Sequence, residues 1–425
     1  MINAARLKER IETLGRIGRL PGGGVTRVAL SMEDKEAQEV VSAWMEEAGM
    51  QVRLDHAGNL IGRLGGVHPD EAPVVIGSHI DSVVNGGKYD GVIGVLGGIE
   101  VVQHMKEENI RPLLPLEVIA FCEEEGSRFQ SGLFGSRAMI GATSEQDLLL
   151  TDKQGVSRRD ALALFGLEPD RIQTEAVRTK DGIRAYLEMH IEQGPVLEKM
   201  GAPVGIVTGI AGPAWIEVVV EGKAGHAGIL PMEMRQDAFL GASEIALLVE
   251  QTCLSFKGSP VVGTVGHVEV KPGGSNIVPG LASFSMDIRD IDVDRRNEVI
   301  RQVKEGALRI CEQRGLRVQF HERMDVPPVQ CTPGIVEVMK EQAKAMHLVC
   351  PELVSGAGHD AQLMAAISDM GMIFVRCRDG ISHNPEEFAE TEDIKLGTEL
   401  LFRVAKHYAM QQTVGMTEKT SAVGD

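Results

Sequence analysis

The stretch GSHIDSVVNGGKYDGVIGVLGGIE, residues 77–100, sets the expected fold of this chain. It follows a short apolar run at 72–78 and leads into an apolar segment at 92–105, a pattern typical of a buried strand followed by a helix. His79 then stands where the strand ends and Asp90 where the helix begins. Open α/β sheets bind their ligands at this carboxyl edge of the strands.

A neutral imidazole and a carboxylate that converge in a glycine-rich loop are suitable ligands for a divalent metal ion. On this stretch alone, a glycine turn that carries an incidental histidine is the competing interpretation. The rest of the chain has to decide between the two.

Apolar runs and helical periods alternate through most of the chain. Buried strands are predicted at 73–78, 115–121, 185–190, 204–207, 353–355 and 372–376. Helices are predicted at 35–48, 92–105, 332–346, 360–367 and 392–410. The order strand, helix, strand over 73–121 predicts a right-handed parallel crossover, and the alternating segment 51–66 predicts a hairpin.

The pattern changes between about 212 and 328, within the few-residue error of such boundaries. Strands predicted at 215–221, 263–270, 281–288 and 316–321 alternate with helices at 237–253 and 294–314. This order indicates a separate, smaller α+β sandwich. The glycine-rich GIAGPA, residues 209–214, is interpreted as the linker that leads into it.

The expected fold class is therefore α/β with two domains. A discontinuous larger domain at 1–211 and 329–412 would contain a mixed, mostly parallel sheet flanked by helices, and 212–328 would be inserted in it as the α+β sandwich. The last residues, 413–425, lack apolar content and are predicted to be disordered.

Composition narrows the possible partners. The formal charge of −18 argues against nucleic acid and against an anionic membrane surface. No apolar run reaches the roughly 18 residues that span a bilayer, and the first residues lack the features of a secretory signal. The six cysteines form no CxxC pair, so free thiols in a reducing compartment, the cytoplasm, are expected.

Acidic residues follow the second predicted strand directly. CEEEG, residues 122–126, comes after the apolar run 115–121. Because neighbouring side chains in extended backbone point to opposite sides, one of Glu124 and Glu125 can bind a metal ion while the other handles protons. Three successive glutamates are usually a solvated patch, but their place at the end of an apolar strand favours a site.

Further motifs carry histidines. EMHIEQG places His190 at a strand end, where a lone histidine is more often a structural residue, and DGISHNPEE places His383 in a loop. SGAGHD, residues 355–360, is another glycine-rich junction between a strand and a helix. The coincidence of three histidines with several carboxylates at strand ends indicates two metal ions that share a bridging ligand, with Zn²⁺ or Mn²⁺ suited to such a set.

Longer motifs extend across nearly the whole chain: GGGVTR, GSHIDSVVNGGKYDG, EEEGSRF, EMHIEQGPVLE, GIAGPAW, GKAGHAGILPM, PGGSNIVP, DIRD and GMIFVRCRDGISHNPEE. With them the sequence resembles the dinuclear-metal amidohydrolases of the aminoacylase and carboxypeptidase G2-like superfamily, and most closely the hydantoinase/carbamoylase subfamily. The resemblance implies a catalytic domain with two divalent metal ions per subunit, Zn²⁺ or Mn²⁺ with Co²⁺ or Ni²⁺ as alternatives. It also implies an insert that acts as a lid and through which two subunits form a homodimer.

Carried over residue by residue, the resemblance implies that Asp90 bridges the two metal ions. His79 and His190 would complete the ligands of one ion, and Glu125 and His383 those of the other.

The resemblance also assigns the catalytic and substrate-binding positions. Glu124 would act as general base and acid, and Asp81 would orient the imidazole of His79. His226 would reach the active site of the partner subunit and help to stabilise the oxyanion there. The positions that match substrate-binding residues are Gln193, His226, Asn276 and Arg289.

Each residue of the insert also has a plainer interpretation. His226 could be a turn residue, and Asn276 could serve the turn that precedes Pro279. Arg289 could form a surface ion pair with Asp287 or Asp290, which would contribute little. Where relatives usually carry threonine this chain has Leu230, which bears on contacts in the lid and not on the chemistry.

A planar guanidinium such as that of Arg289 suits a substrate carboxylate. The expected reaction is hydrolysis of an N-carbamoyl-L-amino acid to the L-amino acid, CO2 and ammonia, because GIAGPAW and FVRCRDGISHNPEE look most like carbamoylases. Allantoate amidohydrolase is the first alternative, followed by β-ureidopropionase and by a peptidase or deacylase of the same superfamily. A non-catalytic binding protein is disfavoured because every expected ligand and the base are present.

Overall fold

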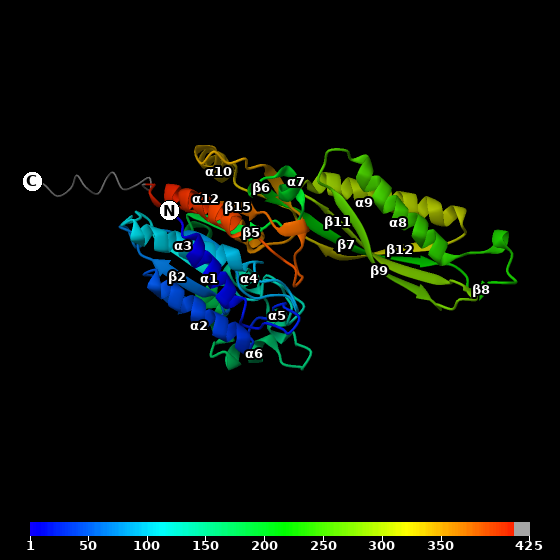
Figure 1. Ribbon diagram of the computed structural model, residues 1–425. Coiled ribbons are helices and arrows are strands. Elements are labelled where there is room, and N and C mark those ends of the chain that lie inside the picture. The colour runs from blue at the N-terminus through cyan, green and yellow to red at the C-terminus, as the bar shows by residue number, and fades with distance from the viewer. Residues whose placement is uncertain (412–425) are drawn as a thin grey trace, which may run out of the picture. The chain divides into compact units, whose positions relative to one another are not determined.

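The structure is a computed structural model that describes residues 1–411 (Figure 1). The chain divides into two compact units. The larger comprises Met1–Thr208, Cys331–Leu353 and the chain from His359 onward, and the smaller comprises Gly209–Gln330 with Val354–Gly358. The tail predicted to be disordered, 413–425, lies outside the described residues.

A mixed sheet forms the centre of the larger unit. Its strands follow the order β1-β2-β4-β3-β5-β15-β6, and the four from β4 to β15 are parallel to one another. These four strands are buried along their whole length, as expected of parallel strands covered on both faces. The bounds are β1 (Gln51–Leu54), β2 (Leu60–Leu64), β3 (Val74–His79), β4 (Leu116–Phe121), β5 (Ala185–Ile191), β6 (Val204–Ile210), β14 (Glu352–Ser355), which pairs with β6, and β15 (Met370–Val375).

Helices flank this sheet, so the predicted α/β fold is confirmed. Of the longer helices, α1, α3 and α12 pack against one another. The helices of the larger unit are α1 (Ala4–Leu14), α2 (Met32–Glu47), α3 (Val92–Glu107), α4 (Phe134–Met139), α5 (Glu145–Leu149), α6 (Arg158–Leu164), α7 (Val196–Met200), α10 (Pro333–Ala345), α11 (Asp360–Met364) and α12 (Thr391–Ala409). Single turns of 3₁₀ or π type occupy Pro169–Arg171, Ile172–Ala176, Lys180–Gly182 and Arg378–Gly380.

The crossover from β3 through α3 to β4 joins parallel neighbours, as the sequence predicted. The helix α3 begins immediately after Gly91, which has a φ of 65°. A Cβ atom at this position would lie 2.4 Å from the ring of His79, so only glycine allows the helix to start this close to the strand end. The predicted hairpin at 51–66 is also present, as the antiparallel pair β1 and β2.

The segment GIAGPA lies where the larger unit passes into the smaller one, as predicted, but it consists of strand and not of a loop. Strand β6 runs to Ile210, and β7 begins at Gly212. A Cβ atom at Gly212 would lie 2.2 Å from the carbonyl oxygen of Val326. The glycine therefore permits two backbone segments to approach closely, whereas the sequence pattern suggested a flexible connection.

The smaller unit is an antiparallel sheet with two helices on one face (Figure 1). The strand order is β12-β7-β11-β9, and α8 and α9 pack together and against these strands. Residues of β11 alternate between buried and half-exposed positions, so one face of the sheet lies under the helices. The bounds are β7 (Gly212–Glu221), β8 (Gly225–His226), α8 (Ala238–Ser255), β9 (Val262–Lys271), β10 (Ile277–Val278), β11 (Leu281–Asp290), α9 (Val293–Gln313), β12 (Arg317–Asp325) and β13 (Val329–Gln330), with a 3₁₀ turn at Met232–Met234.

All six cysteines are free thiols, as predicted. Within residues 1–411, no helix combines the length and the apolar character that a membrane span requires.

A second, smaller core of the larger unit surrounds Arg158. The side chain of Arg158 is fully buried, and its Nε donates to Oε2 of Glu123 at 3.0 Å. The guanidinium lies over the rings of Phe129 and Phe134, at 5.0 and 4.3 Å from their centroids. This pair therefore ties the short helices of 134–164 to the loop that follows β4.

Replacing Arg158 by alanine should destabilise the larger unit by about 3–5 kcal/mol, because the buried carboxylate of Glu123 loses its only ion-pair partner among the described residues. The double variant R158M/E123Q removes both charges and keeps a side-chain oxygen for the backbone N–H of Phe129, which Glu123 accepts at 3.0 Å. It should lose less stability than R158A. Urea unfolding followed by circular dichroism checks both, and an R158A variant as stable as the parent chain would contradict the assignment.

Candidate metal centre

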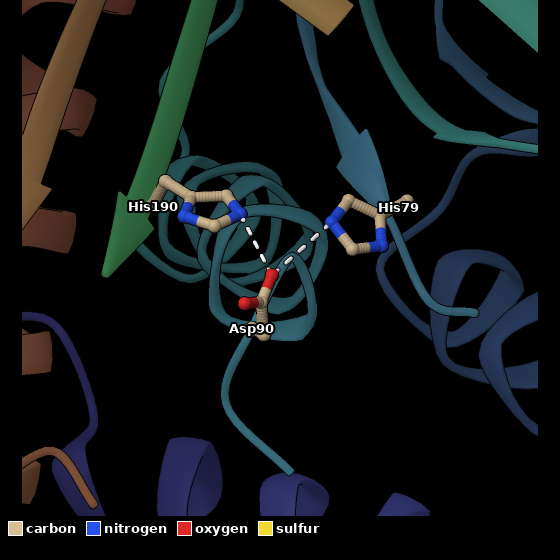
Figure 2. Close-up of side chains that lie close together, drawn as sticks. All are labelled: His79, Asp90 and His190. Carbon is tan, nitrogen blue, oxygen red and sulfur yellow. Dashed lines mark ion pairs between the residues drawn. The ribbon is translucent and has the colours of Figure 1, made fainter. Parts of the chain in front are cut away.

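Two histidines from parallel strands face the same carboxylate oxygen. His79 ends β3, His190 lies in β5, and Asp90 stands just before α3. Oδ1 of Asp90 lies 3.0 Å from Nε2 of His190 and 3.4 Å from Nε2 of His79 (Figure 2). All three side chains are buried. The geometry gives one compact group of three possible ligands.

A second group shares Asp90. Nε2 of His383 lies 3.4 Å from Oδ2 of Asp90 and 3.4 Å from Oε2 of Glu125. In each group the ligand atoms lie within 4.8 Å of one another. Asp90 therefore presents one oxygen to each group, which is the arrangement that a bridging carboxylate requires.

The tautomers of the two buried histidines fit a metal ion. Nδ1 of His79 lies 3.1 Å from the carbonyl oxygen of Asp81, and Nδ1 of His190 lies 3.0 Å from that of Ile191. A neutral ring that donates from Nδ1 keeps a lone pair on Nε2, and here both Nε2 atoms point at Asp90. Imidazole nitrogen with carboxylate oxygen is a donor set that Zn²⁺ and Mn²⁺ accept.

The charges of the site also fit a cation. Burial raises the pKa of Glu124 well above its usual range and that of Glu125 to about 7. Burial opposes the ionisation of Asp90 too, but the histidines around it, His190 first, hold its pKa well below the usual range. The hydrogen bond to Asp90 raises the pKa of His383 to about 9. The negative charge of these carboxylates favours protonated histidines. A divalent cation would supply the positive charge in place of those protons, which the histidines would release when it binds.

Glu124 lies at the edge of the first group. Its Oε2 is 3.7 Å from Nε2 of His79, and its side chain is 11% exposed, so it borders both the ligands and the solvent. The neighbouring Glu123 turns away and accepts from Arg158. Of the three successive glutamates, two thus face the site and one anchors the loop.

Asp81 binds the backbone of the loop that carries Glu124 and Glu125. Its carboxylate accepts the backbone N–H of Glu124 at 3.2 Å and that of Glu125 at 3.3 Å. The same carboxylate lies 3.6 Å from Nδ1 of His79, farther than the carbonyl oxygen of Asp81 itself. Asp81 therefore orients His79 mainly through its backbone, while its side chain fixes the position of the two glutamates.

Sequence reasoning missed two residues of the motif SHNPEE. Oγ of Ser382 lies 2.7 Å from Oδ2 of Asp90 and 3.1 Å from Oε2 of Glu387, and its single O–H donates along the shorter contact, to Asp90. The buried carboxylate of Glu387 accepts the backbone N–H groups of Tyr89 and Asp90, at 2.8 and 3.1 Å. The only sequence signal was a glutamate four positions after His383, and its partners lie almost three hundred positions earlier in the chain.

Gln193, which the resemblance assigns to substrate binding, lies beside Asp90. Its Nε2 donates to Oδ2 of Asp90 at 2.8 Å. Its Oε1 is buried and has no hydrogen-bond donor in the structure. A buried acceptor without a donor is costly, so this oxygen is an unsatisfied polar group beside Asp90.

Three of the predicted substrate-binding residues, His226, Asn276 and Arg289, belong to the smaller unit, and they do not lie together. His226 and Asn276 adjoin on the two-stranded ribbon of β8 and β10, where the N–H of Ala227 donates to the carbonyl oxygen of Asn276 at 2.9 Å. Arg289 lies at the other end of β11, eight residues beyond Leu281. At about 3.3 Å per residue this separates it from the ribbon side by roughly 26 Å.

The local contacts agree in part with the plainer interpretations of these residues, a turn for His226 and an ion pair for Arg289. Arg289 forms an ion pair with Asp287 at 2.8 Å, whereas Asp290 is buried and pairs with Arg295. Nδ1 of His226 accepts the N–H of Gly228, and the ring is exposed. Leu230 covers Gly225, so its side chain packs within the loop.

Comparison with known proteins shows to which family the chain belongs. The model of peptidase family M20/M25/M40 matches residues 75–407. An N-carbamoyl-L-amino-acid amidohydrolase of Pseudomonas sp. (strain NS671) is 49% identical over 409 residues, which cover 96% of this chain and 99% of that protein. An allantoate deiminase of Arabidopsis thaliana is 35% identical over 416 residues, 91% of this chain and 79% of that protein.

The fold agrees with the sequence comparison. The crystal structure of an amidase of the hydantoinase/carbamoylase family from Burkholderia multivorans superposes with a TM-score of 0.91 at 35% identity, covering 97% of this chain and 99% of that one. Because the family match spans most of the chain and the similarity to these proteins extends over nearly its full length, the chain belongs to peptidase family M20/M25/M40.

Proposed function

We propose that this chain is a metal-dependent hydrolase that converts an N-carbamoyl-L-amino acid to the L-amino acid, CO2 and ammonia. The observation that carries the proposal is the 49% identity to the Pseudomonas N-carbamoyl-L-amino-acid amidohydrolase over almost the whole of both chains. Free thiols and the absence of a membrane-spanning helix in the described part suit a cytoplasmic enzyme. The charge of −18 leaves a small molecule as the natural partner, and neither nucleic acid nor a membrane.

Two divalent cations, Zn²⁺ or Mn²⁺ with Co²⁺ or Ni²⁺ as alternatives, would complete the site. His79, Asp90 and His190 would hold one, and Asp90, Glu125 and His383 the other. Such a pair of cations polarises a scissile carbonyl and acidifies a bound water.

Proton transfer would fall to Glu124. It borders the ligand group, and burial raises its pKa, which brings a carboxylate base closer to neutral pH. In this proposal Glu124 takes a proton from the attacking water and delivers it to the leaving nitrogen. Asp81 holds it in place through the backbone N–H groups of the loop.

Gln193 would bind the ureido group. Its Nε2 donates to Asp90, while its Oε1 is buried and has no donor among the described residues. A carbamoyl N–H supplies that donor, and an ester in the same place does not. This supports a substrate that carries N–H next to the scissile carbonyl.

A homodimer would complete the substrate site. His226 and Asn276 lie at the ribbon of β8 and β10, which adjoins the start of β11, whereas Arg289 lies near the other end of β11. One small molecule is too short to touch both places. We therefore propose that His226 and Asn276 act on the site of the partner subunit while Arg289 acts in its own chain, with the smaller unit as dimerisation and lid domain.

Exposed apolar residues on the smaller unit support a second copy as its partner. The edge strand β9 exposes Val262 and Val268 by 52% and 48%, and α8 exposes Leu247 and Leu254 by 56% and 69%. An unpaired edge strand beside an apolar helix face is suited to pairing with another chain.

Allantoate is the first alternative substrate, because it also joins a carboxylate to ureido groups and because one relative is an allantoate deiminase. β-Ureidopropionate and N-acylated amino acids or dipeptides follow. The wall of the pocket, and not the metal ligands, would decide among them.

Ammonia and amine release from a substrate panel tests the function. The panel contains N-carbamoyl-L-methionine, allantoate, β-ureidopropionate, N-acetyl-L-methionine and a dipeptide, each assayed with Mn²⁺-loaded and Zn²⁺-loaded protein. N-carbamoyl-L-methionine should give the highest kcat/KM. Release from allantoate alone, or from the acyl and peptide compounds alone, would overturn the proposal, and binding without turnover would favour a non-catalytic protein.

Replacing Glu387 by alanine should weaken metal binding, because the loop that carries Asp90 loses its acceptor for two backbone N–H groups and its contact to Ser382. Loss of such a supporting contact typically costs about 10–100-fold in metal affinity. Isothermal titration of metal-free protein with Mn²⁺ measures the effect. The control is E386A, an exposed neighbour, which should bind as the parent chain does; equal affinity of E387A and the parent would remove Glu387 from the assignment.

Mixing two inactive variants tests both the base and the dimer. E124Q should bind metal normally but lose turnover by several orders of magnitude, and H226A should be nearly inactive. Equal amounts allowed to exchange subunits should regain roughly a quarter of the parent activity, since half of the dimers are mixed and each holds one complete site. E124Q mixed with R289A should gain no activity beyond that of R289A alone, because both changes then affect sites of their own chains. No recovery with H226A would contradict the sharing of His226.

A further inference from the structure

The guanidinium of Arg289 is held on two sides. Its Nε and Nη2 donate to the carboxylate of Asp287, with the shortest distance 2.8 Å, from Nη2 to Oδ2. Its Nη1 donates to the carbonyl oxygen of Gly356 at 2.8 Å. All three residues belong to the smaller unit.

Some N–H groups of the Arg289 guanidinium remain free to bind a ligand. A guanidinium has five N–H groups, one on Nε and two on each terminal nitrogen. Asp287 and Gly356 use three of them: that of Nε, one on Nη2 and one on Nη1. One N–H therefore remains on each terminal nitrogen, and two such groups are what a carboxylate needs for a bidentate contact.

The sheet dictates which acid can hold Arg289. Residues two apart on a strand share a face, so Asp287 lies on the same side of β11 as Arg289. The other neighbouring acid, Asp290, points to the buried face and is taken by Arg295 at 2.5 Å. On the adjacent strands, Pro213 and Val262 stand opposite Arg289, and neither offers a side-chain acceptor.

We propose that Asp287 is a positioning residue for Arg289: together with the carbonyl of Gly356, it fixes the guanidinium so that its two remaining N–H groups receive the substrate carboxylate. The inference rests on the proposed function in two respects: the substrate carries a carboxylate, and Arg289 binds it. Arg289 and Asp287 are 29% and 28% exposed on their side chains, so a ligand can reach the pair. Without Asp287 the long side chain of arginine is free to take other rotamers, and the ordering has to occur when substrate binds.

The alternative is that Asp287 competes with the substrate for the guanidinium. In that case its removal would strengthen binding. The donor count argues against this alternative, because Asp287 occupies the Nε side and leaves one N–H on each of Nη1 and Nη2.

The test compares a substrate with and without its carboxylate. The parent chain, D287A, R289A and the double variant are assayed on N-carbamoyl-L-methionine and on N-carbamoyl-L-methioninamide, which lacks the negative charge. D287A should lower kcat/KM for the acid about tenfold, through KM, which is the size expected for one charge-assisted contact. It should leave the amide nearly unchanged, and it should have no further effect in the R289A background.

A matched control comes from the same face of the same sheet. Glu217 lies on β7 and pairs with Arg323, away from Arg289. E217A removes the same charge from a comparable position and should bind the acid as the parent chain does.

Three results would overturn the inference. They are a lower KM for the acid in D287A, an equal loss on acid and amide, and a loss that persists when Arg289 is absent. If the parent chain cleaves no carbamoyl compound, the proposed function fails by itself. The same four proteins are then compared on N-acetyl-L-methionine and its amide, where the role of Asp287 is judged by the same carboxylate dependence.

Discussion

The carboxylate of Asp90 is the contact on which the larger unit depends. One of its oxygens faces imidazoles from two parallel strands, and the other faces His383 from the far end of the chain together with Ser382 and Gln193. Three segments that lie apart in the sequence therefore converge on one side chain. The close start of α3 at Gly91 is what brings that side chain to the strand ends.

Such a concentration of acids is unfavourable unless positive charge enters it. Asp90, Glu124 and Glu125 lie together with little solvent, and burial raises the pKa of both glutamates. A buried charge persists only when it is paired or binds a cation. The fold therefore supports the site in two ways: Asp81 and Glu387 fix the backbone of the acidic loops, and the histidines supply neutral nitrogen ligands aimed at the same space.

The sequence predicted most of this site and less of what supports it. His79, His190 and the two glutamates could be found because each stands at the end of an apolar run, which marks a strand end, whereas His383 lies in a loop and was found through its motif. Asp81 and Glu387 act on backbone N–H groups 43 and almost three hundred positions away, and no local pattern indicates such partners. The strand structure of GIAGPA was missed for the same reason, because Gly212 is needed where the distant backbone of Val326 approaches it.

The segment Val354–Gly358 has a consequence for how this architecture can be rearranged. It belongs to the smaller unit by its contacts, through the bonds from Ala211 to Ser355 and from Arg289 to Gly356, although the chain on both sides of it belongs to the larger unit. The next residue, His359, lies edge-on against the ring of His190, with 4.6 Å between ring centroids. Excising 209–330 would thus strip the partners from a strand end that leads straight into the metal centre. The smaller unit is not a cassette that recombination could exchange in one piece.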